Sequence, residues 1–372
     1  MSAHQINPSP LLVSALLHPA SCSALSLSDW DLLVRQARRA NLLATLGLRL
    51  QSSGQQAQVP SCAWVHFESA LVLVRRQSAA VANEVGHIRK ALAAVDAPLV
   101  LLKGAAYLLS SHPAAAGRMF SDVDILVPQQ HLGQVEAALM VNGWQFGDLD
   151  AYDSRYYRQW MHELPPLMHM RRQTTLDVHH TILPPTASTK INSQALFEDL
   201  VPVEGQAGVF VLSPEAMLLH SATHLFHEGE FDNGLRDLVD LDVLLRTLGG
   251  EAMDWRSLLS RAQRLGLEQV LGLALRCVRR LLGTPLPADL LLNTQAESAS
   301  GLVTRALDFA YLRALRPQHA SCKLPGSDLA LSGLYIRSHY LRMPSHLLAY
   351  HLARKLILRS FTSPEAEQDA QA

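Results

Sequence analysis

The chain has few of the features that commit a protein to a special partner or compartment. Its 372 residues contain 32 Lys and Arg against 33 Asp and Glu, a net charge of −1. A balance this close to neutral gives no general attraction to nucleic acid or to an anionic membrane. The four cysteines are far apart and form no C-x-x-C pair, which is typical of unpaired thiols in a reducing cytoplasm. Partners must therefore be inferred from local surfaces.

Long apolar runs and targeting signals are also missing. No apolar stretch approaches the ~18 residues that suggest a transmembrane helix. The N-terminus lacks a basic segment followed by an apolar run, and no internal repeat is visible. We therefore expect a soluble, cytoplasmic protein without a membrane span, long enough for two or three domains with a substantial core.

Hydrophobic periodicity divides the chain into segments. Residues 1–95 predict an N-terminal helical region that packs behind a central sheet, with Ser26 as an N-cap and a long helix from about residue 63 to 95. Residues 96–212 predict an α+β core, closed by edge strands at 201–203 and 209–212. Residues 213–362 predict a C-terminal helical region starting at the N-cap Ser213, and residues 363–372 a disordered tail.

The most informative stretch is residues 101–127, LLKGAAYLLSSHPAAAGRMFSDVDILV. A short apolar run ends at Lys103-Gly104, where the glycine is expected to allow a tight turn into a helix. Backbone N–H groups at that helix start could then approach a phosphate closely. Asp122 and Asp124 follow at the mouth of a second apolar strand, and residues two apart in a strand face the same side. Two carboxylates held in this way are a suitable oxygen site for Mg²⁺.

The context of this Asp-x-Asp pair makes it specific. The chain has two other such pairs, Asp148-Leu149-Asp150 and Asp240-Leu241-Asp242, but neither follows a strand, a Lys-Gly turn and a helix. In haloacid-dehalogenase phosphatases and many Asp-x-Asp glycosyltransferases the apolar residues precede the acidic pair. Here they follow it, at residues 125–127, which disfavours both classes.

The pattern Leu-Lys-Gly at 102–104, a helix, Arg118 and then Ser-Asp-Val-Asp-Ile-Leu-Val at 121–127 resembles the polymerase-β-type nucleotidyltransferase superfamily. It is most similar to a bacterial group of largely uncharacterised nucleotidyltransferases written with Leu-Lys-Gly in place of the usual Gly-Ser. The resemblance covers roughly residues 30–280 and implies a small mixed sheet with helices, flanked by helical regions. Ala105 departs from the superfamily, which has Ser or Gly there, so one side-chain contact to phosphate could be missing. Lys103 or Ser121 could substitute for it.

A hairpin is predicted around residues 171–173, and its second strand contains Leu176-Asp177-Val178-His179. In the resembling family a third carboxylate comes from a strand written much like this, so Asp177 is the candidate. The resemblance implies transfer of a nucleoside monophosphate from an NTP to an acceptor, with Mg²⁺ or Mn²⁺ as cofactor and release of pyrophosphate. The implied catalytic, metal-binding residues are Asp122, Asp124 and Asp177, and the implied phosphate-binding residues are Lys103, Gly104, Arg118 and Ser121.

The acceptor is not encoded in a readable way. A small molecule or saccharide is favoured over tRNA or protein, because a macromolecular acceptor would favour a strongly basic face. Arginines of the C-terminal half could still bind an anionic acceptor or be solvated. The aromatic and basic residues between Tyr152 and Trp160 could stack a base or sugar, or form an exposed helix edge. A toxin-like enzyme acting on tRNA or protein and a nucleotide-binding module without turnover both remain open, as does the oligomeric state.

Several polar residues outside the motif have two interpretations. His179 shares a strand face with Asp177 and could contact a phosphate or the acceptor, whereas His180 should face the packing layer. Arg236 and Asp240 are spaced as an i,i+4 surface ion pair, although Asp240 and Asp237 could instead face the cleft.

Three histidines lie on the predicted helix that begins near Ser213. His220 and His224 are one turn apart and could share a zinc ion, with His227 nearby. The glutamate of a His-Glu-x-x-His protease is absent, because Ser221 and Ala222 follow His220. In the resembling family the corresponding helical segment lines the nucleotide side of a cleft, so the resemblance implies the same position for this helix.

Overall fold

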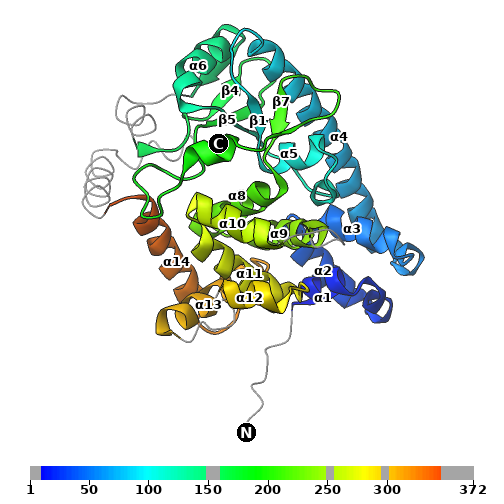
Figure 1. Ribbon diagram of the computed structural model, residues 1–372. Coiled ribbons are helices and arrows are strands. Elements are labelled where there is room, and N and C mark those ends of the chain that lie inside the picture. Colours follow the sequence, from blue (N-terminus) through cyan, green and yellow to red (C-terminus); the bar gives the residue numbers. More distant parts are fainter. Residues whose placement is uncertain (1–9, 148–159, 249–254, 295–300, 345–372) are drawn as a thin grey trace, which may run out of the picture.

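The computed structural model describes residues 10–147, 160–248, 255–294 and 301–344. A sheet with its covering helices forms one layer, and a body of helices forms the other, drawn below it in Figure 1. The predicted α+β core flanked by helical regions is confirmed. The predicted tail at 363–372 and nearly all of the aromatic cluster at 152–160 lie outside the described residues.

Seven strands form one mixed sheet in the order β3-β4-β5-β2-β1-β7-β6. They are β1 (Leu99–Leu101), β2 (Val123–Leu126), β3 (Trp144–Phe146), β4 (Leu167–His169), β5 (Thr175–His179), β6 (Val201–Pro202) and β7 (Val209–Val211). In the centre, β2 pairs antiparallel with β1 and parallel with β5. Every residue of β1 and β2 is buried, which explains why both were visible as apolar runs.

Two predictions about the strands have different outcomes. The hairpin is confirmed, because β4 and β5 pair antiparallel. The prediction that residues 209–212 form an edge strand is wrong, because β7 pairs with β1 on one side and β6 on the other. Only β6, which contains Pro202, lies at that edge, where the missing N–H of proline costs no ladder hydrogen bond.

Three helices belong to the sheet layer: α4 (Ser61–Ala91), α5 (Lys103–Leu109) and α6 (Leu132–Val141). The long α4 runs beside the sheet in Figure 1 and contacts β2, α5 and α6. Its Gln77 side chain accepts a hydrogen bond from the Phe120 N–H at 3.2 Å. Its buried Glu84 accepts two from the Arg172 guanidinium at 2.6 and 3.0 Å. The long N-terminal helix therefore packs against the sheet, as expected.

The first helices do not follow this expectation. The helices α1 (Leu11–Leu17), α2 (Leu27–Arg39) and α3 (Leu43–Ser52) lie beside the C-terminal helices in Figure 1. Arg39 of α2 forms an ion pair with Asp232 at 2.6 Å, and the Gln36 amide donates to the Ser321 hydroxyl at 2.8 Å. An apolar helix face specifies burial but not the surface that covers it, so periodicity could not name this partner.

The helical body consists of α8 (Pro214–His227), α9 (Gly234–Leu248), α10 (Trp255–Leu265), α11 (Glu268–Leu282), α12 (Ala288–Asn293), α13 (Leu302–Ala314) and α14 (Ser327–Arg342). The predicted N-cap of α8 is confirmed, since the Ser213 hydroxyl accepts the Ala216 N–H at 3.4 Å. In Figure 1, α8 lies where the helical body meets the sheet layer, which places it at the site described below.

Two further features of the structure are the pairing state of the cysteines and the hydropathy of the helices. All four cysteines are unpaired, with Cys62 exposed and the other three buried. Within the described ranges, none of the helices combines the length and the hydropathy needed to span a bilayer.

Candidate active site

Strand register brings three carboxylates together. In the parallel pair β2 and β5, Asp124 lies opposite Asp177, and Asp122 immediately precedes β2. One oxygen from each of Asp122, Asp124 and Asp177 lies within 4.8 Å of the others. Parallel neighbours present equivalent ends at the same edge of a sheet, so this convergence follows directly from the topology.

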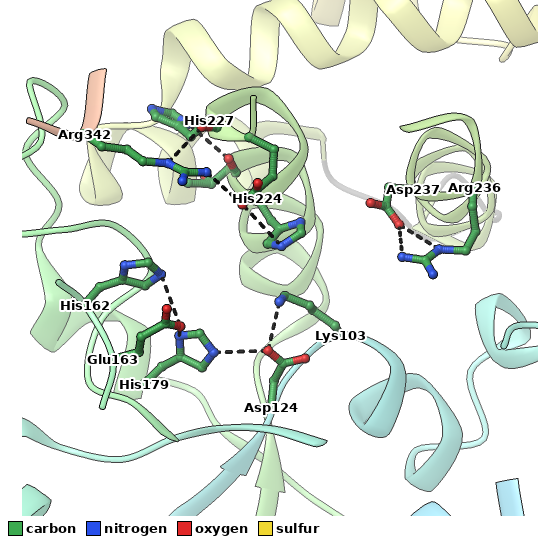
Figure 2. A network of polar contacts seen from close by, with 12 residues as sticks. Lys103, Asp124, His162, Glu163, His179, His224, His227, Arg236, Asp237 and Arg342 are labelled. Carbon is green, nitrogen blue, oxygen red and sulfur yellow. Dashed lines mark hydrogen bonds and ion pairs between the residues drawn. The ribbon is translucent and has the colours of Figure 1, made fainter. Parts of the chain in front are cut away.

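Asp124 is the buried member of the group, with an exposed fraction of 4 %. The Lys103 ammonium donates to its Oδ1 at 2.8 Å, and His179 Nε2 contacts the same oxygen at 3.1 Å (Figure 2). Burial alone would raise the pKa of Asp124, but Lys103 and His179 hold this pKa well below its usual value. Burial alone would lower the pKa of Lys103, but the charge of Asp124 raises this pKa above its usual value. Asp124 is therefore an ionised carboxylate at neutral pH.

Asp177 has an unsatisfied oxygen. Its Oδ1 is buried and has no hydrogen-bond partner among the residues that the structure describes. Burial, together with the negative charges of Asp124 and Glu163, raises the pKa of Asp177 to about 7. A buried carboxylate oxygen without a partner costs free energy, and a divalent cation ligated by oxygens would supply that partner. The three carboxylates therefore fit a hard divalent ion such as Mg²⁺.

The turn after β1 differs in detail from the expectation. The residue with left-handed backbone is Lys103, with a φ of 45°, and not Gly104. A lysine in this region is strained, and such strain is often found at functional sites. Gly104 is needed for a different reason: an added Cβ would lie 2.8 Å from the Phe120 ring and closer still to the Arg118 guanidinium. The glycine therefore permits close approach, while the lysine makes the turn.

Ala105, the departure from the superfamily pattern, faces the core. Its exposed fraction is 2 %, and it does not line the pocket described below. Alanine supplies no hydroxyl group at position 105. The Ala105 side chain also does not line the pocket.

Arg118 and Asp240 form a buried ion pair. Arg118 Nε donates to Asp240 Oδ2 at 2.8 Å, and the two side chains are 10 % and 9 % exposed. Burial would lower the pKa of Arg118, but Asp240 raises it. The expected pair of Arg236 with Asp240 is wrong, since Arg236 instead donates to Asp237 at 2.7 and 2.9 Å (Figure 2). The i,i+4 spacing allows Arg236 to pair with Asp240. The buried Asp240 carboxylate pairs instead with Arg118, because the tertiary fold brings that guanidinium next to it.

A pocket of about 150 Å³ opens beside the carboxylates. Residues of the sheet layer that line it are Lys103, Gly104, Tyr107, Arg118, Ser121, Asp122 and Asp124. Residues of α8, of α9 and of the turn before α9 complete it: Ser221, His224, Asn233, Arg236, Asp237 and Asp240. The predicted phosphate-binding residues thus share one pocket with two of the carboxylates, whereas Asp177 is not among the lining residues. The sequence offered no signal for Tyr107, Asn233 or Arg236, because packing between distant segments brings them there.

A second polar group lies next to the first. His179 contacts Asp124 through Nε2 and Glu163 through Nδ1, the latter at 3.2 Å, and His162 lies beside Glu163 (Figure 2). Burial would lower the pKa of His179, but the two carboxylates raise it. Burial and the charge of His179 hold the pKa of His162 well below its usual value, and burial raises the pKa of Glu163. Sequence reasoning missed His162 and Glu163.

The remaining histidines have separate environments. Burial lowers the pKa of His220 to about 3 and that of His227 to about 4. His224 lines the pocket, so α8 does line the cleft as expected. Neither of the two potential ligand groups among the described residues includes His220 or His224, so the shared zinc site gains no support. His180, also buried, is 3.3 Å from the Met161 carbonyl oxygen, consistent with its predicted inward orientation.

The mixed sheet, the converging carboxylates and the adjoining Lys-Gly turn are consistent with a nucleotidyltransferase core, and the acidic group could bind a divalent metal. The chain belongs to the family described as "Uncharacterised nucleotidyltransferase", whose model matches residues 26–283, well over half of the sequence. Neither a search of curated proteins nor one of solved structures gave a match.

Proposed function

We propose that the protein is a Mg²⁺-dependent nucleotidyltransferase that moves a nucleoside monophosphate from an NTP to an acceptor hydroxyl and releases pyrophosphate, with Mn²⁺ as an alternative ion. The observation that carries this proposal is the group of Asp122, Asp124 and Asp177, whose oxygens converge and include one buried oxygen without a partner. Family membership and the adjacent Lys103 support it.

Asp122 and Asp124 would hold two metal ions, and Asp177 would complete the ligand set on the acceptor side. When bound, the ions lower the pKa of the attacking hydroxyl and neutralise charge on the triphosphate. Asp177 would also help to remove the acceptor proton, acting as a carboxylate base beside the attacking hydroxyl. Asp124 and Asp177 have different roles because their side-chain contacts differ. Lys103 and His179 keep Asp124 ionised, whereas no such cation contacts Asp177 Oδ1.

The phosphates would lie against Lys103, the Gly104 backbone, Arg118 and Ser121, all of which line the pocket. Their positive groups would offset the charge that grows on the leaving pyrophosphate. Arg118 is fixed through Nε by Asp240, so its orientation is set before the nucleotide binds. Such preorganised charge costs no reorganisation during the reaction.

The pocket suggests how much of the nucleotide is enclosed. Its volume of about 150 Å³ is below the roughly 300–1,000 Å³ of typical ligand pockets. We infer that it encloses the phosphates and metals, with the base and sugar outside.

The acceptor is proposed to be a small molecule or saccharide. Among the described arginines of the C-terminal half, Arg276 and Arg280 pair with Asp308, and Arg337 donates to the Phe226 carbonyl oxygen. Arginines engaged in this way do not offer the open basic face that tRNA binding requires.

Calorimetric titration with NTP tests the proposal. We expect wild type to bind only with Mg²⁺, and Asp122→Ala/Asp124→Ala to lose at least about 100-fold in affinity, or ~2.7 kcal/mol. Asp328→Ala is a suitable control, because Asp328 is an exposed carboxylate on α14. Failure of folded wild type to bind any NTP would refute the proposal. Binding without transfer of labelled nucleotide to any of a panel of hydroxyl acceptors would favour the module without turnover.

A further inference from the structure

His162, Glu163 and His179 converge beside the carboxylates. Their ligand atoms all lie within 4.8 Å of one another. Glu163 Oε2 is 3.2 Å from His179 Nδ1 and 3.8 Å from His162 Nε2. Ligands of a tetrahedral zinc ion lie roughly 3.4 Å apart, because each bond is about 2.1 Å long. The observed separations bracket that value, and Figure 2 shows the three side chains turned toward one another.

The backbone holds these side chains in place. The Leu164 N–H donates to the Val178 carbonyl oxygen at 2.8 Å, and the His180 N–H donates to the His162 carbonyl oxygen at 2.9 Å. Glu163 and His179 are bridge partners across this pairing. A bend at residues 161–162 precedes the bridge. Two segments fastened together in this way present their side chains with little loss of freedom on binding.

The His162 imidazole has no hydrogen-bond partner within the described part of the chain. Its Nδ1 is buried and unpartnered, and its Nε2 is too far from Glu163 for a hydrogen bond, at 3.8 Å. Its side chain is 19 % exposed. An imidazole largely removed from water without a partner is unusual, and coordination to an ion would supply the missing interaction.

We propose that His162, Glu163 and His179 form a second metal site, for a divalent transition ion, with Zn²⁺ as the best fit. Two imidazoles and one carboxylate suit zinc and similar ions, whereas the all-oxygen group of Asp122, Asp124 and Asp177 suits Mg²⁺. A water molecule would take the fourth coordination position. This site goes beyond the proposed function and does not depend on nucleotide binding.

His179 links the two groups. When its Nδ1 binds the ion, its Nε2 carries the proton and donates to Asp124 Oδ1, which lies 3.1 Å away. This carboxylate–histidine–metal arrangement recurs in protein metal sites, where it fixes the tautomer and orientation of the ring. The second metal therefore acts as a positioning element: it holds His179, and His179 holds Asp124.

Titration of the metal-free, untagged, full-length protein with Co²⁺ tests the site, because the visible absorption of Co²⁺ reports its ligands. The background is Asp122→Asn/Asp177→Asn, which disables the carboxylate group and keeps Asp124 as the partner of His179. We expect one equivalent of Co²⁺ to bind with visible bands and to be displaced by Zn²⁺. In this background His162→Ala and the isosteric Glu163→Gln should each weaken binding at least about tenfold. His131→Ala, which removes a half-buried histidine elsewhere, should not.

The outcomes are distinct from those of the NTP titration. Unchanged Co²⁺ bands in folded His162→Ala and Glu163→Gln, or no Co²⁺ bands in the background protein, would overturn the second site and leave the nucleotidyltransferase proposal intact. Loss of NTP binding in the background protein with its Co²⁺ bands retained would support two separate sites. Circular dichroism of every variant confirms folding.

Discussion

Arg118 and Asp240 join two layers of the protein, because Arg118 precedes β2 and Asp240 lies in the middle of α9. Their ion pair is buried and short, at 2.8 Å. It lies at the wall of the pocket, so this ion pair contributes both to the packing of the helical body on the sheet layer and to the shape of the pocket.

Asp240→Asn is expected to lower the free energy of unfolding by about 3–5 kcal/mol, because it leaves a buried guanidinium without its counter-ion. Equilibrium unfolding in urea measures this loss. Asp31→Asn is the matched control: it breaks the pair with Arg35, whose side chains are 54 % and 66 % exposed in the order Arg35, Asp31. An exposed pair is worth about 0–1 kcal/mol. Equal effects of the two substitutions would contradict the structural role of Asp240.

Gly104→Ala is expected to disturb the pocket. The new methyl group would meet the Phe120 ring at 2.8 Å and the guanidinium that Asp240 holds, so a side chain must move. We expect a loss of about 1–3 kcal/mol in stability, and weaker NTP binding in calorimetry. Gly133→Ala on α6 is the control, since nothing lies within 4 Å of its added Cβ. There alanine should stabilise the helix by up to about 1 kcal/mol. A neutral Gly104→Ala would show that close packing at this turn is unimportant.

Asp177→Asn is expected to increase the stability of the metal-free protein and to abolish its stabilisation by Mg²⁺. The pKa of Asp177 is raised from 3.8 to about 7, so the folded chain binds more protons than the unfolded chain between these values, and stability falls as pH rises from 3.8 to about 7. Above that pH the buried charge costs on the order of 4 kcal/mol or less. At pH 8 without metal, the asparagine variant should therefore melt at a higher temperature than wild type. Added Mg²⁺ should raise the melting temperature of wild type and not that of the variant. If Asp177→Asn were less stable than metal-free wild type at pH 8, the conclusion that the buried Asp177 carboxylate is unsatisfied would be wrong.

The buried His220 is expected to make the stability of the protein depend on pH in the acid range. Burial lowers its pKa from 6.5 to about 3, so the unfolded chain binds more protons than the folded one between these values. Stability is then fully present above pH 6.5 and falls as pH decreases. At pH 5 the cost from this residue is about 2 kcal/mol. Urea unfolding at pH 7.5 and pH 5 measures it. His220→Leu should reduce the difference between the two pH values, and an unchanged difference would assign the acid sensitivity elsewhere.

The elements that could be predicted depend on local rules. Alternation of strand faces and the Leu-Lys-Gly and Asp-x-Asp motifs were sufficient to propose Asp122 and Asp124 as a pair. Asp177 was proposed from the resemblance of its strand to the family pattern, and the oxygens of all three carboxylates do converge. The β4–β5 hairpin follows from its turn and flanking strands. Each of these signals lies within a few residues in the sequence.

What could not be predicted depends on contacts between distant segments. Asp240 reaches Arg118 across 122 positions, and Asn233 and Arg236 reach the pocket only because α9 packs on the sheet layer. The pairing of residues 162–164 with β5 has no periodic pattern of its own. The positive φ of Lys103 is also invisible, because glycine is the residue that normally marks such a turn.

The register between β2 and β5 has a further consequence. Asp124 and Asp177 are opposite each other because backbone hydrogen bonds pair their strands, and not because of the chain that connects them. Evolution can therefore lengthen, shorten or replace the connection between the two strands without moving the carboxylates.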